Sequence, residues 1–510
     1  MSISPKTFFG EAEELPEEQY DVLVVGGGIT GIQAALDLGD MEFKVLLVEK
    51  EPSIGGMMYK LSKTFPTMDC ASCIATPRMA SVAHHKNVKV LTYAEVREVR
   101  REGGGFKVRV YEKPRYVDAS ACTGCKQCEY VCPVIVPSEY DYGLAGRKAI
   151  FIPFDTAVPR IALIDMDHCI FCGQCERICP ANAVDFLQTP KWHNVKVNAI
   201  ILATGFSLFP AELKENYHFG EYPNVITSMQ MERMLSPTRP FHAIVRPSDG
   251  KKPKKVAFIQ CVGSRNPEKN PGCSRFCCPT TIKQAVRLRE NGVNVAVLHR
   301  DMRTVGAKAE EHYRHARALG VRFIRYTSER LPRVIGNANQ AEAVDILELA
   351  LNRVLEIDVD YIVLAAGMVP NKESTDKLHE ILKLPIGADG FFMERHAKLG
   401  PVETTTEGVF LAGCVSGPKD ISDSIAQGSA AAAKVASFIA RDTVMLEPIT
   451  CVVQQDLCRA CGRCVEICEY HAPSLIEIVP GLKVAEINQA LCKGCGTCAS
   501  WCPTGAIEAQ

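Results

Sequence analysis

The feature that most constrains this chain is a glycine-rich turn between two regular segments near the N-terminus. The apolar run Val22 to Val25 predicts a buried parallel strand, and residues 32–38 follow with helical periodicity. The spacing G-x-G-x-x-G lets the backbone approach a pyrophosphate at a helix N-terminus, where free N–H groups and the helix dipole favour negative charge. The glycines that supply this spacing are Gly26, Gly28 and Gly31.

A second apolar strand supports the same interpretation. Residues 45–48 form another apolar run, which ends at Glu49, eighteen residues after Gly31. An acidic side chain at about this distance can accept hydrogen bonds from a ribose hydroxyl. Strand, turn, helix, strand and acid together predict a dinucleotide-binding unit.

Length and charge narrow the classes of function. With 510 residues the chain is expected to form two or more domains. Its formal net charge of -1 gives no electrostatic reason to expect nucleic acid or an anionic membrane as a partner. Residues 1–20 lack the apolar core of a signal peptide, and no apolar run is long enough to span a bilayer. We therefore expect a cytoplasmic protein without a transmembrane segment.

Twenty-four cysteines in such a chain indicate metal rather than disulfides, because cytosolic thiols are kept reduced. Sixteen of them fall into four runs with the spacing C-x2-C-x2-C-x3-C, and proline follows three of the runs. This is the pattern of bacterial two-cluster ferredoxins, in which the fourth cysteine of each run ligates the cluster of the other run. Zinc binding by C-x-x-C pairs is the alternative, and the repetition of the whole run argues against it.

The four runs predict two ferredoxin modules that hold four 4Fe–4S clusters. In the first module the expected ligand sets are Cys122, Cys125, Cys128 and Cys179, and then Cys169, Cys172, Cys175 and Cys132. In the second module they are Cys458, Cys461, Cys464 and Cys502, and then Cys492, Cys495, Cys498 and Cys468. Glu469 replaces the proline after one run and leaves its ligands intact.

A separate cysteine pair precedes these modules. Gly55 and Gly56 end a flexible turn of the kind that lets the backbone approach a flavin or its phosphates, and Cys70 and Cys73 follow as C-x-x-C. Three interpretations of the pair remain open. It is a redox dithiol beside a flavin, two ligands of a further cluster completed from elsewhere, or a pair of buried thiols packed as small hydrophobes.

A second nucleotide-binding-like unit is expected from residue 256 onward. Val256 to Ile259 is predicted to be its first strand, but closely spaced glycines do not follow, which argues against an NAD(P)H site. Lys283 lies on an expected helix over 281–290, where a solvated lysine is the simplest interpretation. Four cysteines occur in this region, and their spacing leaves a cluster and structural thiols as equal alternatives: Cys261, Cys273, Cys277 and Cys278.

Later segments are expected to return to the first unit. An apolar strand over 197–203 ends at Thr204 and Gly205. A further strand ends at Gly413, and Cys414 stands where many flavin reductases have an aspartate that binds the ribityl chain. A small-residue helix over 429–440 then follows, whose N-terminus could face the pyrophosphate or the flavin ring. The residues that lead into it include Asp420 and Gln427.

These observations give an α/β fold of two dinucleotide-binding-like domains with one inserted and one C-terminal ferredoxin-type module. Residues 1–20 are expected to form an N-terminal arm. The expected order after it is a flavin domain in three parts (21–113, 191–255 and 385–447), the inserted module (114–190), the second nucleotide-binding-like domain (256–384) and the C-terminal module (448–510).

The motifs, taken in order, resemble those of the HdrA family, the FAD-bearing iron–sulfur subunits of heterodisulfide reductase. The resemblance runs from about residue 20 to the C-terminus, and it is carried by residues 26–35, Phe65 to Cys73, Cys277-Cys278-Pro279, Gly413-Cys414 and the two ferredoxin modules. It implies a fold like that of thioredoxin reductase, bound FAD, a homodimer, and a place in a multi-subunit complex that splits electron pairs.

The resemblance also implies roles that the residues alone leave open. In that family the cysteines matching Cys261, Cys273, Cys277 and Cys278 hold a non-ferredoxin 4Fe–4S cluster near the flavin. The lysine matching Lys283 is expected close to the flavin N5, where a cation would stabilise the reduced, anionic ring. Cys414 in place of aspartate is usual for the family and does not count against FAD.

One departure from the family concerns Cys70 and Cys73. Many members carry an additional N-terminal domain with its own cluster, to which this region contributes, whereas this chain starts almost directly at the flavin strand. On the resemblance we expect the form that lacks this domain, with a partner completing the site or the site left empty.

The expected function is that of an electron-transfer hub with flavin-based electron bifurcation between a disulfide or similar acceptor and ferredoxin. The expected partners are HdrB- and HdrC-like subunits, ferredoxin, and a donor of the hydrogenase or formate dehydrogenase type. The alternatives are a non-bifurcating conduit, a flavin disulfide reductase that uses Cys70 and Cys73, and an amidotransferase-type reductase component fed by NADPH. The last two need a pyridine-nucleotide site.

Overall fold

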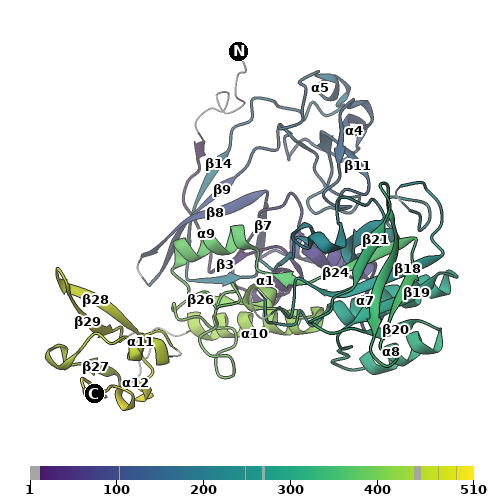
Figure 1. The fold of residues 1–510 in the computed structure, drawn as a ribbon. Coiled ribbons are helices and arrows are strands. Elements are labelled where there is room, and N and C mark those ends of the chain that lie inside the picture. Colours follow the sequence, from purple (N-terminus) through teal and green to yellow (C-terminus); the bar gives the residue numbers. More distant parts are fainter. Residues whose placement is uncertain are drawn as a thin grey trace.

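Two five-stranded parallel sheets form the body of the molecule (Figure 1). The computed structural model describes residues 12–102, 104–246, 248–266, 270–440, 449–468, 470–489 and 491–509. The first sheet has the order β26 (Val409–Leu411), β15 (Ala199–Leu202), β3 (Val22–Val25), β4 (Val45–Glu49) and β7 (Val88–Thr92). The second has the order β17 (Val225–Thr227), β24 (Tyr361–Ala366), β18 (Lys255–Val262), β19 (Asn294–His299) and β20 (Arg322–Arg325).

The central strands are continuous apolar runs because both faces of each parallel sheet are covered. In the first sheet one face packs on α1 (Ile29–Asp40), α3 (Ala71–Ala83) and α10 (Ile421–Ile439). The other face packs on an antiparallel sheet of β8 (Ala94–Glu102), β9 (Gly105–Glu112) and β14 (Lys191–Val197). The N-terminal strands β1 (Glu13–Glu14) and β2 (Glu18–Gln19) extend this sheet by pairing with β14.

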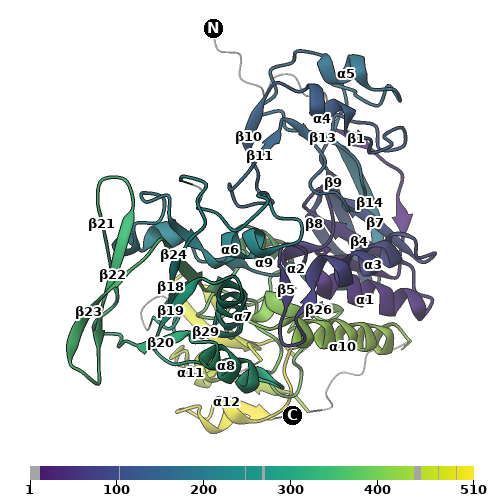
Figure 2. The same cartoon turned by 90° about the vertical axis from the view of Figure 1, so that its right-hand side faces the viewer.

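The second sheet carries α6 (Ser228–Leu235), α7 (Cys277–Glu290) and α8 (Ala309–Ala318). A three-stranded antiparallel sheet, which projects from this unit in Figure 2, consists of β21 (Arg333–Gly336), β22 (Ala341–Glu348) and β23 (Arg353–Asp358). Two short strands, β16 (Ser207–Leu208) and β25 (Met368–Val369), pair where the chain crosses between the two units.

The two cysteine-rich modules differ in how the chain enters them. The inserted module leaves the antiparallel sheet after β9 and returns at β14; its elements are α4 (Gln127–Val131), β10 (Ile135–Pro137), β11 (Gly146–Lys148), β12 (Ile150–Phe151), β13 (Leu163–Ile164) and α5 (Gln174–Ile178). The C-terminal module, yellow in Figure 1, contains β27 (Cys451–Val453), α11 (Arg463–Ile467), β28 (Pro473–Val479), β29 (Leu482–Ile487), α12 (Thr497–Ser500) and β30 (Ile507–Ala509). The remaining short elements are α2 (Gly56–Tyr59), β5 (Lys63–Thr64), β6 (Asp69–Cys70), η2 (Ala211–Leu213), η3 (Glu215–Tyr217), η4 (Gly413–Ser416) and η5 (Gln455–Leu457).

Two expected domain boundaries are misplaced. The first-unit segment expected to run to residue 255 ends earlier, because β17 pairs with β24 in the second sheet and α6 packs against α7. The second unit ends before residue 384, because α9 (Lys372–Leu382) packs its buried leucines on the first sheet. Both segments are amphipathic and short, so their patterns do not say which of two similar sheets they cover.

The helix expected over 429–440 is also longer than its small-residue stretch. It begins at Ile421, because the Asp420 carboxylate caps it and accepts a hydrogen bond from Asp423 N at 2.7 Å. In the part of the chain that the structure describes, no helix is both long enough and apolar enough to cross a membrane.

Helices α1 and α10 pack closely because glycine occupies the contact. A Cβ on Gly428 would lie 2.8 Å from the Thr30 carbonyl oxygen, which belongs to the α1 backbone and cannot rotate away. We predict that Gly428→Val destabilises the protein by about 1–3 kcal/mol through overpacking. The control Ala430→Val, on an exposed position of the same helix, should change the stability by less than about 0.5 kcal/mol. Urea denaturation of both variants measures the difference, and equal stabilities would contradict this packing.

Candidate functional site

A cavity of about 1710 Å³ opens at the carboxyl ends of the strands of the first sheet. This edge is where open α/β sheets bind their ligands. Eight of the residues expected to bind the cofactor line its wall: Gly26, Gly28, Glu49, Gly56, Thr204, Gly205, Cys414 and Asp420. The sequence pattern therefore brings residues from five separate segments to a single cavity.

The turn between β3 and α1 requires glycine at two positions. Gly26 has φ +111°, and a Cβ there would lie 2.4 Å from the Ala203 carbonyl oxygen. A Cβ on Gly31 would lie 1.9 Å from the Gly26 carbonyl oxygen. The chain can therefore turn tightly enough to present the N-terminus of α1 to the cavity.

Glu49 is held in place by two backbone groups. Its carboxylate accepts hydrogen bonds from Gly27 N at 2.6 Å and from Glu51 N at 2.8 Å. Burial raises the pKa of this carboxyl group, and the two hydrogen bonds oppose that change. The acid is thus fixed at the end of β4, where the ribose of a dinucleotide is expected.

Four expected cofactor-binding residues lie behind the cavity wall. Gly31 and Gly413 allow close packing around α1, since a Cβ on Gly413 would meet Thr30 Oγ1 at 2.4 Å. Gln427 accepts a hydrogen bond from Gly413 N at 3.0 Å, and Gly55 packs against Met79. Their place in the structure is to shape the wall rather than to line it.

The polar atoms of the cavity fit a bound dinucleotide. Thr204 Oγ1 and Tyr140 Oη are buried without a hydrogen-bond partner, and both residues line the wall. Buried polar atoms are normally paired, so each indicates a group that the cavity is built to receive. Together with the glycine turn and Glu49, they fit FAD.

Lys283 lies on α7 and forms a buried ion pair, so its interpretation as a solvated lysine is wrong. Its side chain is 3% exposed, and Nζ lies 2.8 Å from the Glu232 carboxylate and 2.7 Å from the Lys63 carbonyl oxygen. Lys283 also lines the cavity. A buried cation beside the flavin cavity is therefore already fixed in position.

Glu232, on α6, was not identified from the sequence. It accepts further hydrogen bonds from Ser62 N, Ser62 Oγ and Gln284 Nε2 at 2.6–2.8 Å. Burial raises the pKa of its carboxyl group, but attraction to Lys283 and these hydrogen bonds outweigh burial and hold the pKa below its usual value. The only feature of the sequence that could have indicated a buried acid is its position in a methionine-rich amphipathic segment.

Breaking this buried pair should be costly. We expect Glu232→Ala to destabilise the protein by about 3–5 kcal/mol, because it leaves the Lys283 ammonium buried without its counter-charge. The double variant Glu232→Leu with Lys283→Met should recover most of the loss, since it removes both charges. Urea denaturation of the parent, the single variant and the double variant measures these changes; a single variant as stable as the parent would contradict the prediction.

The same pair predicts a pH dependence. The pKa of Glu232 is lower in the folded than in the unfolded chain, so its contribution is complete above the unfolded value and is lost as the pH falls through the folded value. As the pH is lowered, the free energy of unfolding should therefore fall more for the parent than for the double variant, which lacks Glu232.

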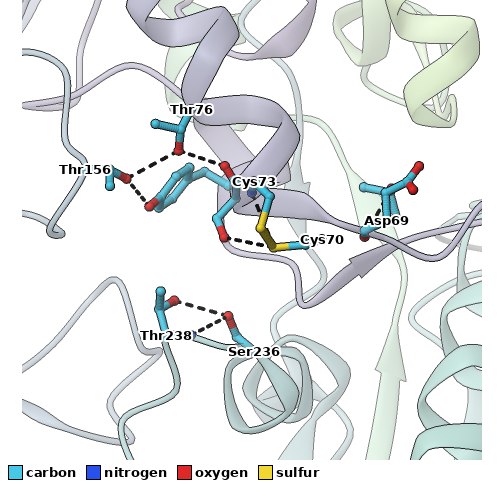
Figure 3. Close-up of a disulfide and its surroundings, with 10 residues drawn as sticks. Asp69, Cys70, Cys73, Thr76, Thr156, Ser236 and Thr238 are labelled. Carbon is cyan, nitrogen blue, oxygen red and sulfur yellow. Dashed lines mark hydrogen bonds between the residues drawn. A yellow bond between two sulfur atoms is a disulfide. The ribbon is translucent and has the colours of Figure 1, made fainter.

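Cys70 and Cys73 form a disulfide at the start of α3 (Figure 3). Cys73 is exposed and Cys70 half-buried, so their interpretation as buried thiols is wrong. The bonded pair is the oxidised form of a dithiol. Cys70 on β6 pairs with Lys63 on β5, and the carbonyl oxygen of Lys63 accepts a hydrogen bond from Lys283 Nζ. The disulfide and the buried ion pair are therefore separated by a single pair of strands.

The ferredoxin cysteines share one local geometry. In all four runs the residue after the second cysteine has a left-handed backbone and precedes a short helix or turn; these are Lys126, Gly173, Gly462 and Gly496. Cysteines make up half of the buried core of the C-terminal module, whereas in the inserted module they pack around a core of isoleucine, valine, alanine and aromatic side chains. The C-terminal module is thus built around its thiol groups.

In both modules the fourth cysteine of one run lies near a cysteine of the other run. The Cys132 thiol lies close enough to Cys169 to contribute, after burial, to raising its pKa. In the C-terminal module Cys468 acts in the same way on Cys498. Both pairs lie as the exchange of the fourth cysteine requires, and the ligand sets themselves stay a prediction.

Cys451, which lies in the C-terminal module, belongs to none of the four runs. This cysteine is buried, and its backbone N–H points to Cys492 Sγ at 3.2 Å. Hydrogen bonds to ligand sulfur raise cluster potentials. Cys451 therefore borders the ligand set that begins at Cys492.

Paired cysteine substitutions test these ligand sets. Cys132→Ser and Cys169→Ser should each remove one cluster, about four irons per chain, and the double variant should lose no more than either single variant. The matched double variant of Cys122→Ser with Cys169→Ser should lose about eight. Iron analysis of the purified proteins gives the result, and additive loss in the first pair would contradict the exchange.

Three segments of the second unit supply its four scattered cysteines: β18, the loop before α7, and the start of α7. Cys261 ends β18 at a bulge with φ +60°, an uncommon conformation for a residue with a side chain. Cys277 and Cys278 begin α7, and burial together with Cys261 and Cys273 raises their pKa. A cluster here would face the free N–H groups of a helix N-terminus.

Three family models match this chain. The model described as FAD dependent oxidoreductase matches residues 21–71, and the model described as 4Fe-4S dicluster domain matches residues 121–184; a second dicluster model matches 457–506. The fold and the sites thus define an oxidoreductase that contains FAD and iron–sulfur clusters, with one inserted and one C-terminal ferredoxin-type module.

Curated relatives identify the family. The chain is 50% identical to an HdrA protein of Methanopyrus kandleri, a CoB–CoM heterodisulfide reductase iron-sulfur subunit, over 94% of this chain and 73% of that protein. It is 46% identical to the corresponding protein of Methanocaldococcus jannaschii, over 93% of this chain and 73% of that protein. This chain belongs to the HdrA family of heterodisulfide reductase iron–sulfur subunits.

Among solved structures, a thioredoxin reductase from T. acidophilum aligns with a TM-score of 0.47 at 14% identity, covering 82% of this chain and 98% of that chain.

Proposed function

We propose that this chain is the hub through which a heterodisulfide-reductase-like complex divides electron pairs between two one-electron paths. One observation carries the proposal. The wall of the FAD cavity includes Glu129, the neighbour of Cys128 in the inserted module, and Phe276 and Pro279, which flank Cys277 and Cys278 in the second unit. Two separate cysteine sets therefore adjoin the same cavity.

The chemistry follows from this placement. Bound FAD would supply the exchange between electron pairs and single electrons, and each cluster accepts one electron. The protein would hold the flavin and the clusters at fixed distances from each other, because residues of the cavity wall are direct neighbours of the cysteines in the sequence. It also disfavours a second hydride-carrying nucleotide in the second unit, where the Phe209 ring fills the space beside Gly263.

Lys283 would act on the flavin as a cation next to N5. The support is its place on the cavity wall and its rigid attachment to Glu232 and Lys63. A buried cation stabilises negative charge that develops on a neighbouring ring more strongly than an exposed one does.

Cys261, Cys273, Cys277 and Cys278 would hold a fifth cluster. The four thiols influence one another electrostatically although up to seventeen positions separate them. Structural thiols give no reason for the left-handed backbone at Cys261, whereas strained conformations are typical of functional sites.

The partners of the proposed complex follow from the relatives. The name of the Methanothermobacter marburgensis protein, 44% identical to this chain, specifies H2, the CoB–CoM heterodisulfide and ferredoxin, and that of Methanococcus maripaludis adds formate. For this chain we propose the same acceptors, a hydrogenase or formate dehydrogenase type donor, HdrB- and HdrC-like subunits and a homodimeric arrangement.

An anaerobic redox titration tests electron bifurcation. If the two one-electron potentials of the flavin are crossed, EPR should detect almost no flavin radical while the cluster signals appear and disappear. The control is the double variant Cys70→Ser with Cys73→Ser, which removes the disulfide couple and leaves the cavity wall unchanged. A well-populated flavin radical in both proteins would contradict bifurcation and leave a plain electron conduit.

A further inference from the structure

Two arginines beside Cys261 each have a buried N–H group without a hydrogen-bond partner. They are Arg265, through Nη1, and Arg300, through Nε. A buried donor left unpaired typically costs about 1–3 kcal/mol, so such donors are rare in native structures. Two of them at one site indicate that the site is built around an acceptor.

The rest of each guanidinium group is held in place. Arg300 Nη1 donates to the Arg265 carbonyl oxygen at 2.7 Å, and Arg265 Nη2 donates to the Asp301 carboxylate at 2.8 Å. The Arg300 carbonyl oxygen in turn accepts from Arg325 Nε at 3.0 Å. These hydrogen bonds connect the loop after β18 to the end of β19. They also fix the orientation of the unpaired N–H groups of both arginines.

The charge around the site is unbalanced. Asp301 is the carboxylate that serves both Arg265 and Arg325, and Arg300 makes no ion pair within 4.0 Å among the described residues. Burial raises the pKa of the Cys261 thiol, while the charges of Arg265 and Arg300 and a hydrogen bond with Arg265 oppose that change. Half-buried cations whose buried N–H groups lack a partner favour an anion at the site.

We infer that Arg265 and Arg300 donate hydrogen bonds to the iron–sulfur cluster bound by Cys261, Cys273, Cys277 and Cys278, and that they raise its reduction potential. This inference rests on the cluster proposed above. A 4Fe–4S cluster with four thiolates is an anion that gains negative charge on reduction. Cationic donors near its sulfurs therefore stabilise the reduced form more than the oxidised form.

The arginines are positioning and tuning residues, since no ligand role is assigned to them. Their position gives this cluster cationic side-chain donors in addition to backbone N–H groups, one of which points to Cys273 Sγ at 3.4 Å. In both modules backbone N–H groups donate to ligand sulfurs, as Phe171 N does to Cys169 and Ala460 N to Cys458. The cluster of the second unit would thus be tuned by side chains that can be exchanged one at a time.

The experiment uses the full-length protein with its cofactors. Cys273→Ser first identifies the EPR signal of this cluster by its loss. Arg265→Gln, Arg300→Gln and Arg265→Lys are then titrated anaerobically beside Arg322→Gln, which removes an exposed charge from the neighbouring strand β20. Iron and FAD contents are measured on every variant.

At a fixed ambient potential the ratio of reduced to oxidised cluster should fall roughly tenfold in each glutamine variant, a shift of about 59 mV for a one-electron couple. Arg265→Lys should show a smaller fall, because it keeps the charge and loses the planar donor geometry. Arg322→Gln should leave the ratio unchanged. If a glutamine variant fails to retain the cluster, the lowered potential in Arg265→Lys still supports the inference.

One result would contradict the tuning role of the arginines, and another would contradict the cluster itself. Full iron content and an unchanged potential in the glutamine and lysine variants would overturn the tuning role and leave the cluster in place. Full iron content and all signals retained in Cys273→Ser would overturn the cluster itself.

Discussion

The structure depends on the parallel pairing of three strands that are far apart in the sequence. Strand β15 lies between β3 and β26, with Ala199 opposite Val22 and Ile200 opposite Val409. The chain leaves this sheet twice and returns to it twice, and each return brings a loop to the same edge. Gly26, Thr204 and Gly413 follow these three strands directly or within two residues. Because the carboxyl ends of parallel strands meet at one edge, a single cavity collects all three loops.

The same pairing explains how a ferredoxin module and a second nucleotide-binding-like unit can be inserted without loss of the first sheet. Both insertions start and end at neighbouring positions, since β9 and β14 pair around the first one and β16 and β25 pair around the second. An insertion with adjacent ends adds little entropic cost to the parent fold. An insertion of this kind also stays close to the edge of the sheet at which it begins. In this molecule that edge borders the cavity.

Buried charge is concentrated where this arrangement needs it. Lys283 and Glu232 compensate each other within the second unit, where Lys63 and Ser62 of the first unit contact them, and Arg265 and Arg300 form a positive site beside Cys261. Buried ion pairs contribute little to net stability, because the cost of removing charge from water offsets most of the attraction. Their presence beside the flavin cavity and a cysteine set is therefore better explained by electron transfer than by folding.

Much of the site could be predicted from local patterns, whereas its electrostatics could not. The glycine turn at Gly26 to Gly31 and the ferredoxin runs are recognisable in the sequence, because hydrogen bonding and ligation there involve residues a few positions apart. The C-x-x-C pattern at Cys70 left a redox dithiol as one of three alternatives, Glu232 carried only a weak signal, and Arg300 carried none. The environment of these three residues includes other segments of the chain, so it depends on how the segments pack.

The amino-acid sequence by itself determined the cofactor classes, since the spacing of glycines and cysteines within single turns fixes which groups the backbone can bind. Only the tertiary structure decided which sheet the segments β17 and α9 join, and that Lys283 is buried rather than solvated. It also decided that Arg265 and Arg300 lie close to Cys261. The physical reason is that burial and charge compensation are properties of contacts between distant segments, which no local spacing encodes.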